Sequence, residues 1–137
     1  MNPIFCRKYV IFSGKIHNFF DQWYANDVYY IGMEIYETSV FTRQITRLIR
    51  DEEYRDLQRV LVVNPLAGAL IKNSGGLRKI RWRIAGKGKS GGIRVIYYYL
   101  TADSKIFMLV AYEKSKKDDL TQKELASIRK LVMEELS

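Results

Sequence analysis

Apolar residues recur at helical spacing in the segment that follows position 38. From Val40 to Arg50 they fall on one face, and Thr38 or Ser39 can cap the start of this helix. A second helix starts at Asp51, where three consecutive acidic residues complement its positive end. Pro65 ends it, because the residue before a proline disfavours helical backbone angles. The pattern therefore predicts two consecutive helices.

The C-terminal segment carries a third apolar stripe. It spans Leu120–Leu136, and Thr121 with Glu124 forms a capping box at its start. Strands are predicted where apolar and polar residues alternate, or where a short apolar run lies between turn residues. The predicted strands are Glu34–Glu37, Leu77–Ile84, Ile93–Leu100 and Lys105–Tyr112, and the segment 66–76 is interpreted as a connection.

The order of these elements, β-α-α-β-β-β-α, predicts an α+β fold. We expect a small antiparallel sheet with the two N-terminal helices packed on one face, together with a C-terminal helix. If the helices cover one face, the other face is left for a ligand. A length of 137 residues suffices for one domain with a hydrophobic core and is too short for two ordinary domains.

Residues 1–32 differ from the rest of the chain because they are rich in aromatic side chains and poor in charge. We interpret them as an N-terminal extension, either flexible or arising from a misassigned start, and place the working domain at 33–137. The rival interpretation is an amphipathic lid or a membrane-surface segment. The apolar run Tyr9–Phe12 is too short to span a bilayer, which needs about 20 residues. The single cysteine, Cys6, allows no internal disulfide, which fits a reducing cytoplasm.

Charge is distributed unevenly along the chain. The net charge is +8 and the pI is about 9.6. No acidic residue occurs between Asp56 and Asp103, whereas the stretch from Lys72 to Arg94 inside this gap holds eight Lys and Arg residues. Alternation along the predicted strand places Leu77, Lys79, Arg81 and Arg83 on one side and Arg78, Ile80, Trp82 and Ile84 on the other.

A cationic surface of this kind repels itself unless a polyanion covers it, and a nucleic-acid backbone is the obvious ligand. The sequence does not predict a zinc site, since one Cys and one His cannot form one. We therefore expect an RNA- or DNA-binding protein that uses no metal and no cofactor.

Three motifs carry a resemblance to a known family. They are Gly-Gly-Leu-Arg-Lys-Ile-Arg at 75–81, Gly-Lys-Gly-Lys-Ser-Gly-Gly-Ile-Arg-Val-Ile-Tyr-Tyr at 86–98 and Tyr-Glu-Lys-Ser-Lys-Lys-Asp-Asp-Leu-Thr at 112–121. Over about 33–137 the chain resembles the RelE superfamily of bacterial toxins, and most closely its HigB-type branch. The resemblance implies a RelE-like fold and a toxin of a type II toxin–antitoxin system.

Toxins of this family enter the ribosomal A site and cleave the translated mRNA without a metal, by attack of a 2′-hydroxyl on the adjacent phosphate. The resemblance thus implies a metal-independent endoribonuclease, or mRNA interferase, that inhibits translation in the cytoplasm. Its implied partners are mRNA, the ribosome with its ribosomal RNA, and a cognate antitoxin, which we expect to be a HigA-type helix-turn-helix protein. The alternative is a non-catalytic RNA- or ribosome-binding module of the same fold.

The resemblance also assigns catalytic residues position by position. Lys79 and Arg81 match the family's pair of cations on this strand, Arg94 matches the arginine of its Gly-x-Arg motif, and Lys114 matches the cation after the last strand. The residues themselves agree with this assignment, because a phosphorane transition state needs cations where negative charge develops. The alternative for each of the four is a solvated surface cation.

The sequence departs from the family pattern near position 120. Several members place a Tyr or His there as acid, base or stacking platform, whereas this chain has Leu120 and no histidine anywhere in 33–137. Lys79, crowded by neighbouring cations, is one candidate for the base. Asp118 or Asp119 is the other, unless these carboxylates serve the start of the last helix.

Further residues are expected to contact RNA or the ribosome. Tyr98 and Tyr112 can stack on bases, with core packing as the alternative for both. The glycine-rich loop 86–92 can approach phosphates closely and adds two lysines, with a merely flexible hairpin as the alternative. The complete expected set is Lys72, Arg78, Arg83, Lys87, Lys89, Tyr98 and Tyr112.

Overall fold

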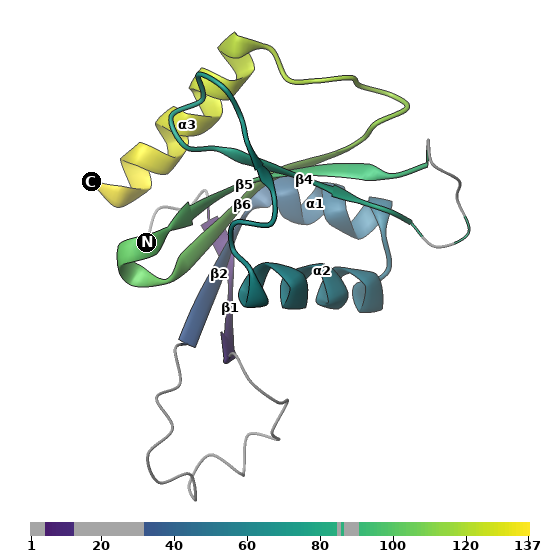
Figure 1. Cartoon of the computed structure of the whole chain (residues 1–137), viewed down its shortest axis with the longest axis horizontal. Helices are drawn as coiled ribbons and strands as arrows, with labels where there is room; N and C mark the ends of the chain where they lie inside the picture. The colour runs from purple at the N-terminus through teal and green to yellow at the C-terminus, as the bar shows by residue number, and fades with distance from the viewer. Residues whose placement is uncertain (1–4, 13–31, 85, 87–90) are drawn as a thin grey trace, which may run out of the picture.

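The computed structural model describes residues 5–12, 32–84, 86 and 91–137. Its elements are, in order, β1 (Phe5–Phe12), β2 (Gly32–Thr38), α1 (Ser39–Leu48), α2 (Asp51–Val63), β3 (Ala69–Leu70), β4 (Arg78–Trp82), β5 (Ile93–Leu100), the 3-10 helix η2 (Thr101–Asp103), β6 (Lys105–Glu113) and α3 (Gln122–Leu136) (Figure 1). All predicted helices and strands are present. The two-residue β3 and the edge strand β1 are additions that the sequence pattern did not predict.

The predicted signals delimit the helices. At the start of α1 the hydroxyl of Thr38 accepts a hydrogen bond of 2.9 Å from the backbone N–H of Phe41. The hydroxyl of Thr121 accepts the corresponding bond of 3.1 Å from Glu124 at the start of α3. The helix α2 begins at Asp51 and ends before Asn64 and Pro65.

The described strands form one sheet in the order β1-β2-β6-β5-β4-β3. Most pairs are antiparallel, as expected, including β4 with β5 and β5 with β6. The expectation of a wholly antiparallel sheet needs one correction, because β2 pairs parallel with β6. A parallel pair requires a long crossover, which the chain between β2 and β6 supplies. Strand patterns along a sequence do not reveal such a pairing between distant segments.

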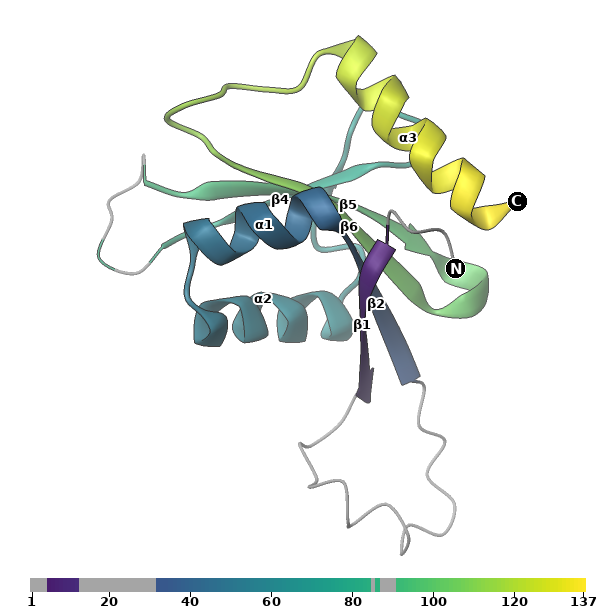
Figure 2. The ribbon, with the colours of Figure 1, turned by 180° about the vertical axis from the view of Figure 1, so that it is seen from behind.

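The helices lie on both faces of the sheet, which corrects the expectation that they cover one face only. Helices α1 and α2 pack on the face that carries Ile80, Val95 and Tyr97, whereas α3 packs on the opposite face, over Leu77 and Ile96. Figure 2 shows α1 and α2 on one side of the sheet and α3 on the other. The physical reason is that both faces carry apolar side chains that must be removed from water.

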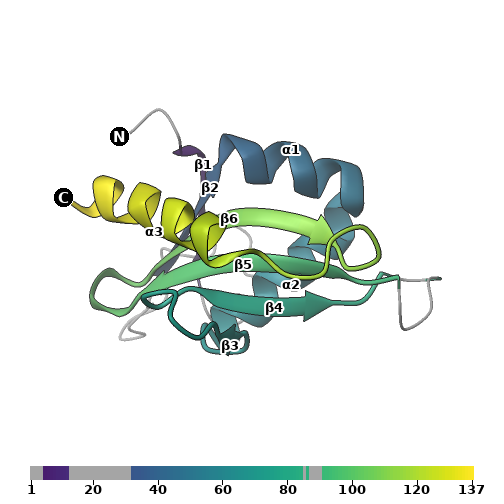
Figure 3. The ribbon, with the colours of Figure 1, turned by 90° about the horizontal axis from the view of Figure 1, so that it is seen from above.

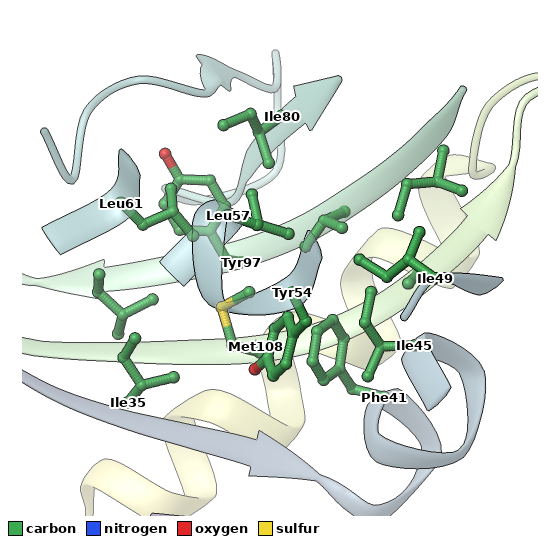
Figure 4. Packing of buried hydrophobic residues seen from close by; sticks show 14 of the residues in the cluster. Ile35, Phe41, Ile45, Ile49, Tyr54, Leu57, Leu61, Ile80, Tyr97 and Met108 are labelled. Atoms are coloured by element: carbon green, nitrogen blue, oxygen red, sulfur yellow. The ribbon is translucent and has the colours of Figure 1, made fainter. Parts of the chain in front are cut away.

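The larger core lies between the sheet and the two N-terminal helices (Figure 4). Its most buried side chains include Phe41, Leu57 and Tyr97. The Tyr97 hydroxyl donates a hydrogen bond to the carbonyl of Pro65 at 2.7 Å and accepts one from the N–H of Gly68 at 2.8 Å. These two bonds attach the connection after α2 to the middle of the sheet.

Strand β1 belongs to the segment 1–32 that the sequence analysis separates as an extension. It pairs antiparallel with β2, and the ring of Phe5, which is 1% exposed, packs edge-on against Phe107 with ring centroids 5.3 Å apart. Part of the segment therefore contributes to the sheet in this structure. Its designation as an extension outside the working domain remains a prediction.

On the edge that faces away from β5, the second half of β6 borders on helix α1 instead of another strand. Strand β2 pairs with β6 only as far as Met108, and a bulge at Leu109 follows, since the β5 partners jump from Val110 to Met108. Beyond the bulge, the side-chain oxygen of Gln44 on α1 accepts a hydrogen bond of 2.8 Å from the N–H of Ala111. Helix α1 thus closes this sheet edge and stands at the border between the two faces.

Candidate nucleic-acid interface

The predicted cations gather at the end of the sheet that α3 leaves uncovered. This end comprises the last residues of β4, the first of β5 and the last of β6 (Figure 3). In the pairing register Arg81 lies opposite Arg94, and Arg94 lies opposite Tyr112. Residues paired directly across strands point to the same face. Arg81, Arg94 and Tyr112 therefore form one row across three strands, which we call the Arg–Arg–Tyr row.

Lys79 lies next to this row on the same face. It lies two positions before Arg81, which is roughly 7 Å along a strand, and its partner on β5 is Ile96 of the α3-covered face. The Lys79 side chain is 24% exposed, and Arg81 is exposed. The sequence prediction that Lys79 and Arg81 share a surface with Arg94 is confirmed by this register.

Gly92 allows β5 to approach β4 closely at the start of the row. A Cβ atom at Gly92 would lie 2.9 Å from the carbonyl oxygen of Trp82, which is too near for a side chain. The same atom would lie 3.7 Å from a guanidinium nitrogen of Arg94, which itself donates to the carbonyl of Ile93 at 3.3 Å. Close packing of the two strands thus requires a glycine at position 92.

Two carboxylates from the segment between β6 and α3 contact the predicted catalytic lysines. The Lys79 ammonium donates a hydrogen bond of 2.6 Å to Asp119, and Lys114 lies 3.8 Å from Asp118. The positive charge of the stretch without acidic residues is therefore partly neutralised by a carboxylate from another segment, which corrects the expectation of wholly uncompensated cations. Figure 3 shows this segment turning back across the sheet before α3 begins.

The charge environment of Asp119 follows from these contacts. The hydrogen bond from Lys79 is the largest cause that lowers the pKa of Asp119, and the charges of Lys79, Lys114 and Arg94 act in the same direction. The neighbour that touches Lys79 is thus a carboxylate. This differs from the purely cationic crowding on which Lys79 as a base was argued.

Tyr112 lies between Arg94 of the row and the cavity that Lys79 lines. Its hydroxyl is buried and has no hydrogen-bond partner among the described residues. Burial is the largest cause that raises the pKa of Tyr112, with Asp119 and Glu124 adding to it and Arg94 opposing it. A cavity of about 220 Å³ beside it is lined by Lys79, Tyr112 and Asp119, together with Ile71, Lys72, Ile96, Leu120, Gln122 and Leu125.

The other expected RNA contacts are dispersed. Lys72 lines the same cavity as Lys79, and Arg83 is exposed just past β4. Arg78 points to the opposite face and donates a hydrogen bond of 2.8 Å to the carbonyl of Gly68, so it does not join the Arg–Arg–Tyr row. Tyr98 packs with the α3-side core. Lys87 and Lys89 fall outside the described residues.

No group of three or more metal-binding side chains occurs in the part of the chain that the structure describes. Over the same residues, none of the helices has the length and apolar character needed to cross a bilayer.

A small α+β fold with a cationic row at one end of its sheet is typical of proteins that bind polyanions. The comparison with known families identifies it further. The family described as RelE toxin of RelE / RelB toxin-antitoxin system matches residues 33–136. The chain belongs to this family and is a toxin of a toxin–antitoxin system.

Sequence reasoning missed two features of this site. One is the contact between Lys79 and Asp119, which lie 40 residues apart. The other is the outer face of α1 beside Tyr112, where Arg43 and Arg47 recur at a spacing of one helical turn. A basic i, i+4 pair on an otherwise amphipathic helix was the available signal for the second feature.

Proposed function

We propose that this toxin is a metal-independent, ribosome-dependent endoribonuclease of the HigB-type branch, which cleaves mRNA in the ribosomal A site and so inhibits translation. The observation that supports it best is the position of Lys79, Arg81, Arg94 and Tyr112 on one face of three neighbouring strands. Such a face can hold a phosphate with several cations and leaves room for a base beside the tyrosine.

The chemistry needs three events. The 2′-oxygen loses a proton and bonds to the adjacent phosphorus, and the bond from phosphorus to the 5′-oxygen breaks as that oxygen gains a proton. The products are a 2′,3′-cyclic phosphate and a 5′-hydroxyl. Negative charge grows on the phosphorane oxygens, where Lys79, Arg81 and Arg94 act by stabilising it. Lys114 supplies a further cation at the end of β6.

Two titratable groups stand beside these cations. Asp119 is a carboxylate acceptor in contact with Lys79; its lowered pKa keeps it ionised at neutral pH but also makes it a weaker base than an ordinary aspartate. The Tyr112 hydroxyl is protonated at neutral pH and so can donate to the leaving oxygen, but its raised pKa makes it a weaker acid than an ordinary tyrosine. From their positions beside these cations, we assign Asp119 as the base and Tyr112 as the acid or as the platform on which a base stacks.

The partners follow from the same face. We propose a cognate antitoxin of the HigA helix-turn-helix type that covers the Arg–Arg–Tyr row and so prevents RNA from binding there. We also propose that the toxin acts on ribosomes in the cytoplasm. An adjacent small gene that encodes a helix-turn-helix protein would support this assignment, and an adjacent gene of another class would contradict it.

The proposal is tested by mapping new 5′ ends of mRNA on translating ribosomes. Wild-type protein should give cuts that Lys79→Ala and Arg94→Ala lose, whereas Arg55→Ala on the exposed surface of α2 should cut like wild type. Equal cutting by all four proteins would contradict the assignment of the row.

A second candidate is a non-catalytic RNA- or ribosome-binding module. It is favoured by the lack of histidine in 33–137 and by the Asp119 carboxylate that accepts a hydrogen bond from Lys79. It predicts ribosome binding that depends on Arg94, without any new 5′ ends.

A further inference from the structure

A second hollow lies on the far side of Tyr112 from Lys79. It has a volume of about 520 Å³ and lies between the outer face of α1 and the end of β6. Its lining combines one helical stripe with the end of the strand: Val40, Arg43, Gln44, Arg47, Leu48, Ala111, Tyr112, Glu113 and Lys116. The volume falls within the range of sites that hold small organic groups, about 300–1,000 Å³. We call this hollow the α1 groove.

The α1 groove is continuous with the candidate nucleic-acid interface. Tyr112 lines both the cavity that contains Lys79 and the α1 groove, and it also lines a third hollow of about 430 Å³ between them and α3. Gln44 is shared by the last two and is fixed by its hydrogen bond to the N–H of Ala111. A ligand that passes Tyr112 therefore meets α1 without leaving the surface.

The lining of the α1 groove suits a nucleotide. Arg43, Arg47 and Lys116 supply three cations against the single carboxylate of Glu113, which Lys116 already contacts at 3.5 Å. Arg43 and Arg47 are exposed, and no ion pair involves either of them among the described residues. They lie one helical turn apart, about 6 Å along the axis, which suits successive phosphates. Val40 is 41% exposed and offers an apolar surface to a base.

We propose that the α1 groove binds the nucleotides of the cleaved RNA strand that flank the scissile linkage, with Arg43 and Arg47 on their phosphates and Tyr112 at the entrance. This inference rests on the proposed nuclease function and extends it by assigning the path of the strand. Charge complementarity and continuity through Tyr112 favour RNA over an acidic protein segment as the occupant.

The test uses RNA oligonucleotides that are 2′-O-methylated throughout and so cannot be cleaved. Binding of a dinucleotide and of a hexanucleotide is measured by fluorescence anisotropy at several salt concentrations for wild type and the double variant R43Q/R47Q. Loss of two phosphate contacts should make the slope of log K against log salt shallower by roughly 1.4 for the hexanucleotide, at about 0.7 per phosphate. Dinucleotide binding should not change, because it spans the Arg–Arg–Tyr row alone.

The control is the double variant R55Q/R59Q on α2, which removes the same charge from a helix outside the α1 groove. It should match wild type for both oligonucleotides. Equal hexanucleotide binding and salt slope in R43Q/R47Q and wild type would overturn the proposal. If that variant instead weakened only the complex with the antitoxin, the groove would be a protein-docking surface and the RNA path would be wrong.

Failure of the inference is distinguishable from failure of the proposed function. If wild type cuts mRNA on ribosomes and R43Q/R47Q binds and cuts equally well, only the groove assignment fails. If wild type makes no cuts while R43Q/R47Q still loses hexanucleotide affinity, the nuclease proposal fails and the groove remains an RNA-binding surface.

Discussion

Replacing Asp119 by Asn tests how the carboxylate that contacts Lys79 affects the site. The substitution keeps the size of the side chain and removes its charge, so the Lys79 ammonium loses the partner it meets at 2.6 Å. An RNA phosphate bound at Lys79 competes with this carboxylate for the ammonium and is repelled by its negative charge. Its removal should therefore favour binding of a polyanion, and we expect the variant to bind RNA more tightly than wild type.

The magnitude follows from the exposure of the pair. Lys79 is 24% and Asp119 is 64% exposed at the side chain, so solvent screens the contact, and exposed ion pairs contribute about 0.2–1 kcal/mol. Release of Lys79 should then raise RNA affinity by about 1.5- to 5-fold. The free energy of unfolding should fall by no more than about 1 kcal/mol.

The assay is anisotropy with the uncleavable hexanucleotide, beside single-turnover cleavage of mRNA on programmed ribosomes. Asp103→Asn is the charge-matched control, since Asp103 lies next to Lys105 at the η2 turn, away from the row. If Asp119 is also the base, the variant should bind more tightly and yet cleave at least about 100-fold more slowly. RNA binding that is weaker than or equal to that of wild type would refute the competition between carboxylate and phosphate.

The contribution of the Asp119 contact to the free energy of unfolding depends on pH, and the direction follows from the pKa shift. The folded-state pKa of Asp119 is lowered, so its stabilising contact is present above the ordinary Asp pKa near 3.8 and is lost as the pH falls through the lowered value. Wild type and Asp119→Asn should therefore differ in unfolding free energy at neutral pH and converge in strong acid. A difference that grows on acidification would contradict this.

Three further predictions concern packing and the hydroxyl of the row. Tyr112→Phe should leave the unfolding free energy, measured by urea denaturation, within about 0.5 kcal/mol of wild type, because the buried hydroxyl makes no hydrogen bond among the described residues. The same substitution should slow cleavage if the hydroxyl is the acid. Gly92→Ala should cost about 1–3 kcal/mol in the same assay, since its Cβ would meet the Trp82 carbonyl at 2.9 Å; an unchanged midpoint would contradict the close approach. A variant that begins at Met33 should fold, as the far-ultraviolet circular dichroism will show, but lose roughly 1.5–3 kcal/mol with the burial of Phe5; failure to fold would exclude the interpretation of 1–32 as an extension.

Much of the secondary structure could be predicted because its signals are local. Caps such as Thr38 and Thr121 and the stop at Pro65 act within one helical turn, and the structure uses them where the sequence has them. Alternation in β4 correctly separated Lys79 from Arg78, yet the sequence analysis still expected Arg78 to contact the RNA that the catalytic Lys79 acts on. Charge counting overrode the periodicity that placed Arg78 on the other face.

The remaining features depend on contacts between distant segments. The parallel pairing of β2 with β6 and the docking of α3 on the second face follow from which apolar surfaces meet, and no local pattern encodes that choice. The same holds for Asp119, which reaches Lys79 only because the chain after β6 turns back across the sheet. The α1 groove likewise exists only because α1 replaces a strand beside the end of β6.

The central claim is that the cations of the Arg–Arg–Tyr row and Lys79 act on a phosphodiester during cleavage. The most direct measurement is single-turnover cleavage of mRNA on programmed ribosomes by wild type, Lys79→Ala and Arg94→Ala, with the chemistry of the new ends determined. We predict 2′,3′-cyclic phosphate ends for wild type and rates reduced by about 100- to 1,000-fold in each variant. Wild-type rates in both variants, or ends without a cyclic phosphate, would contradict the claim.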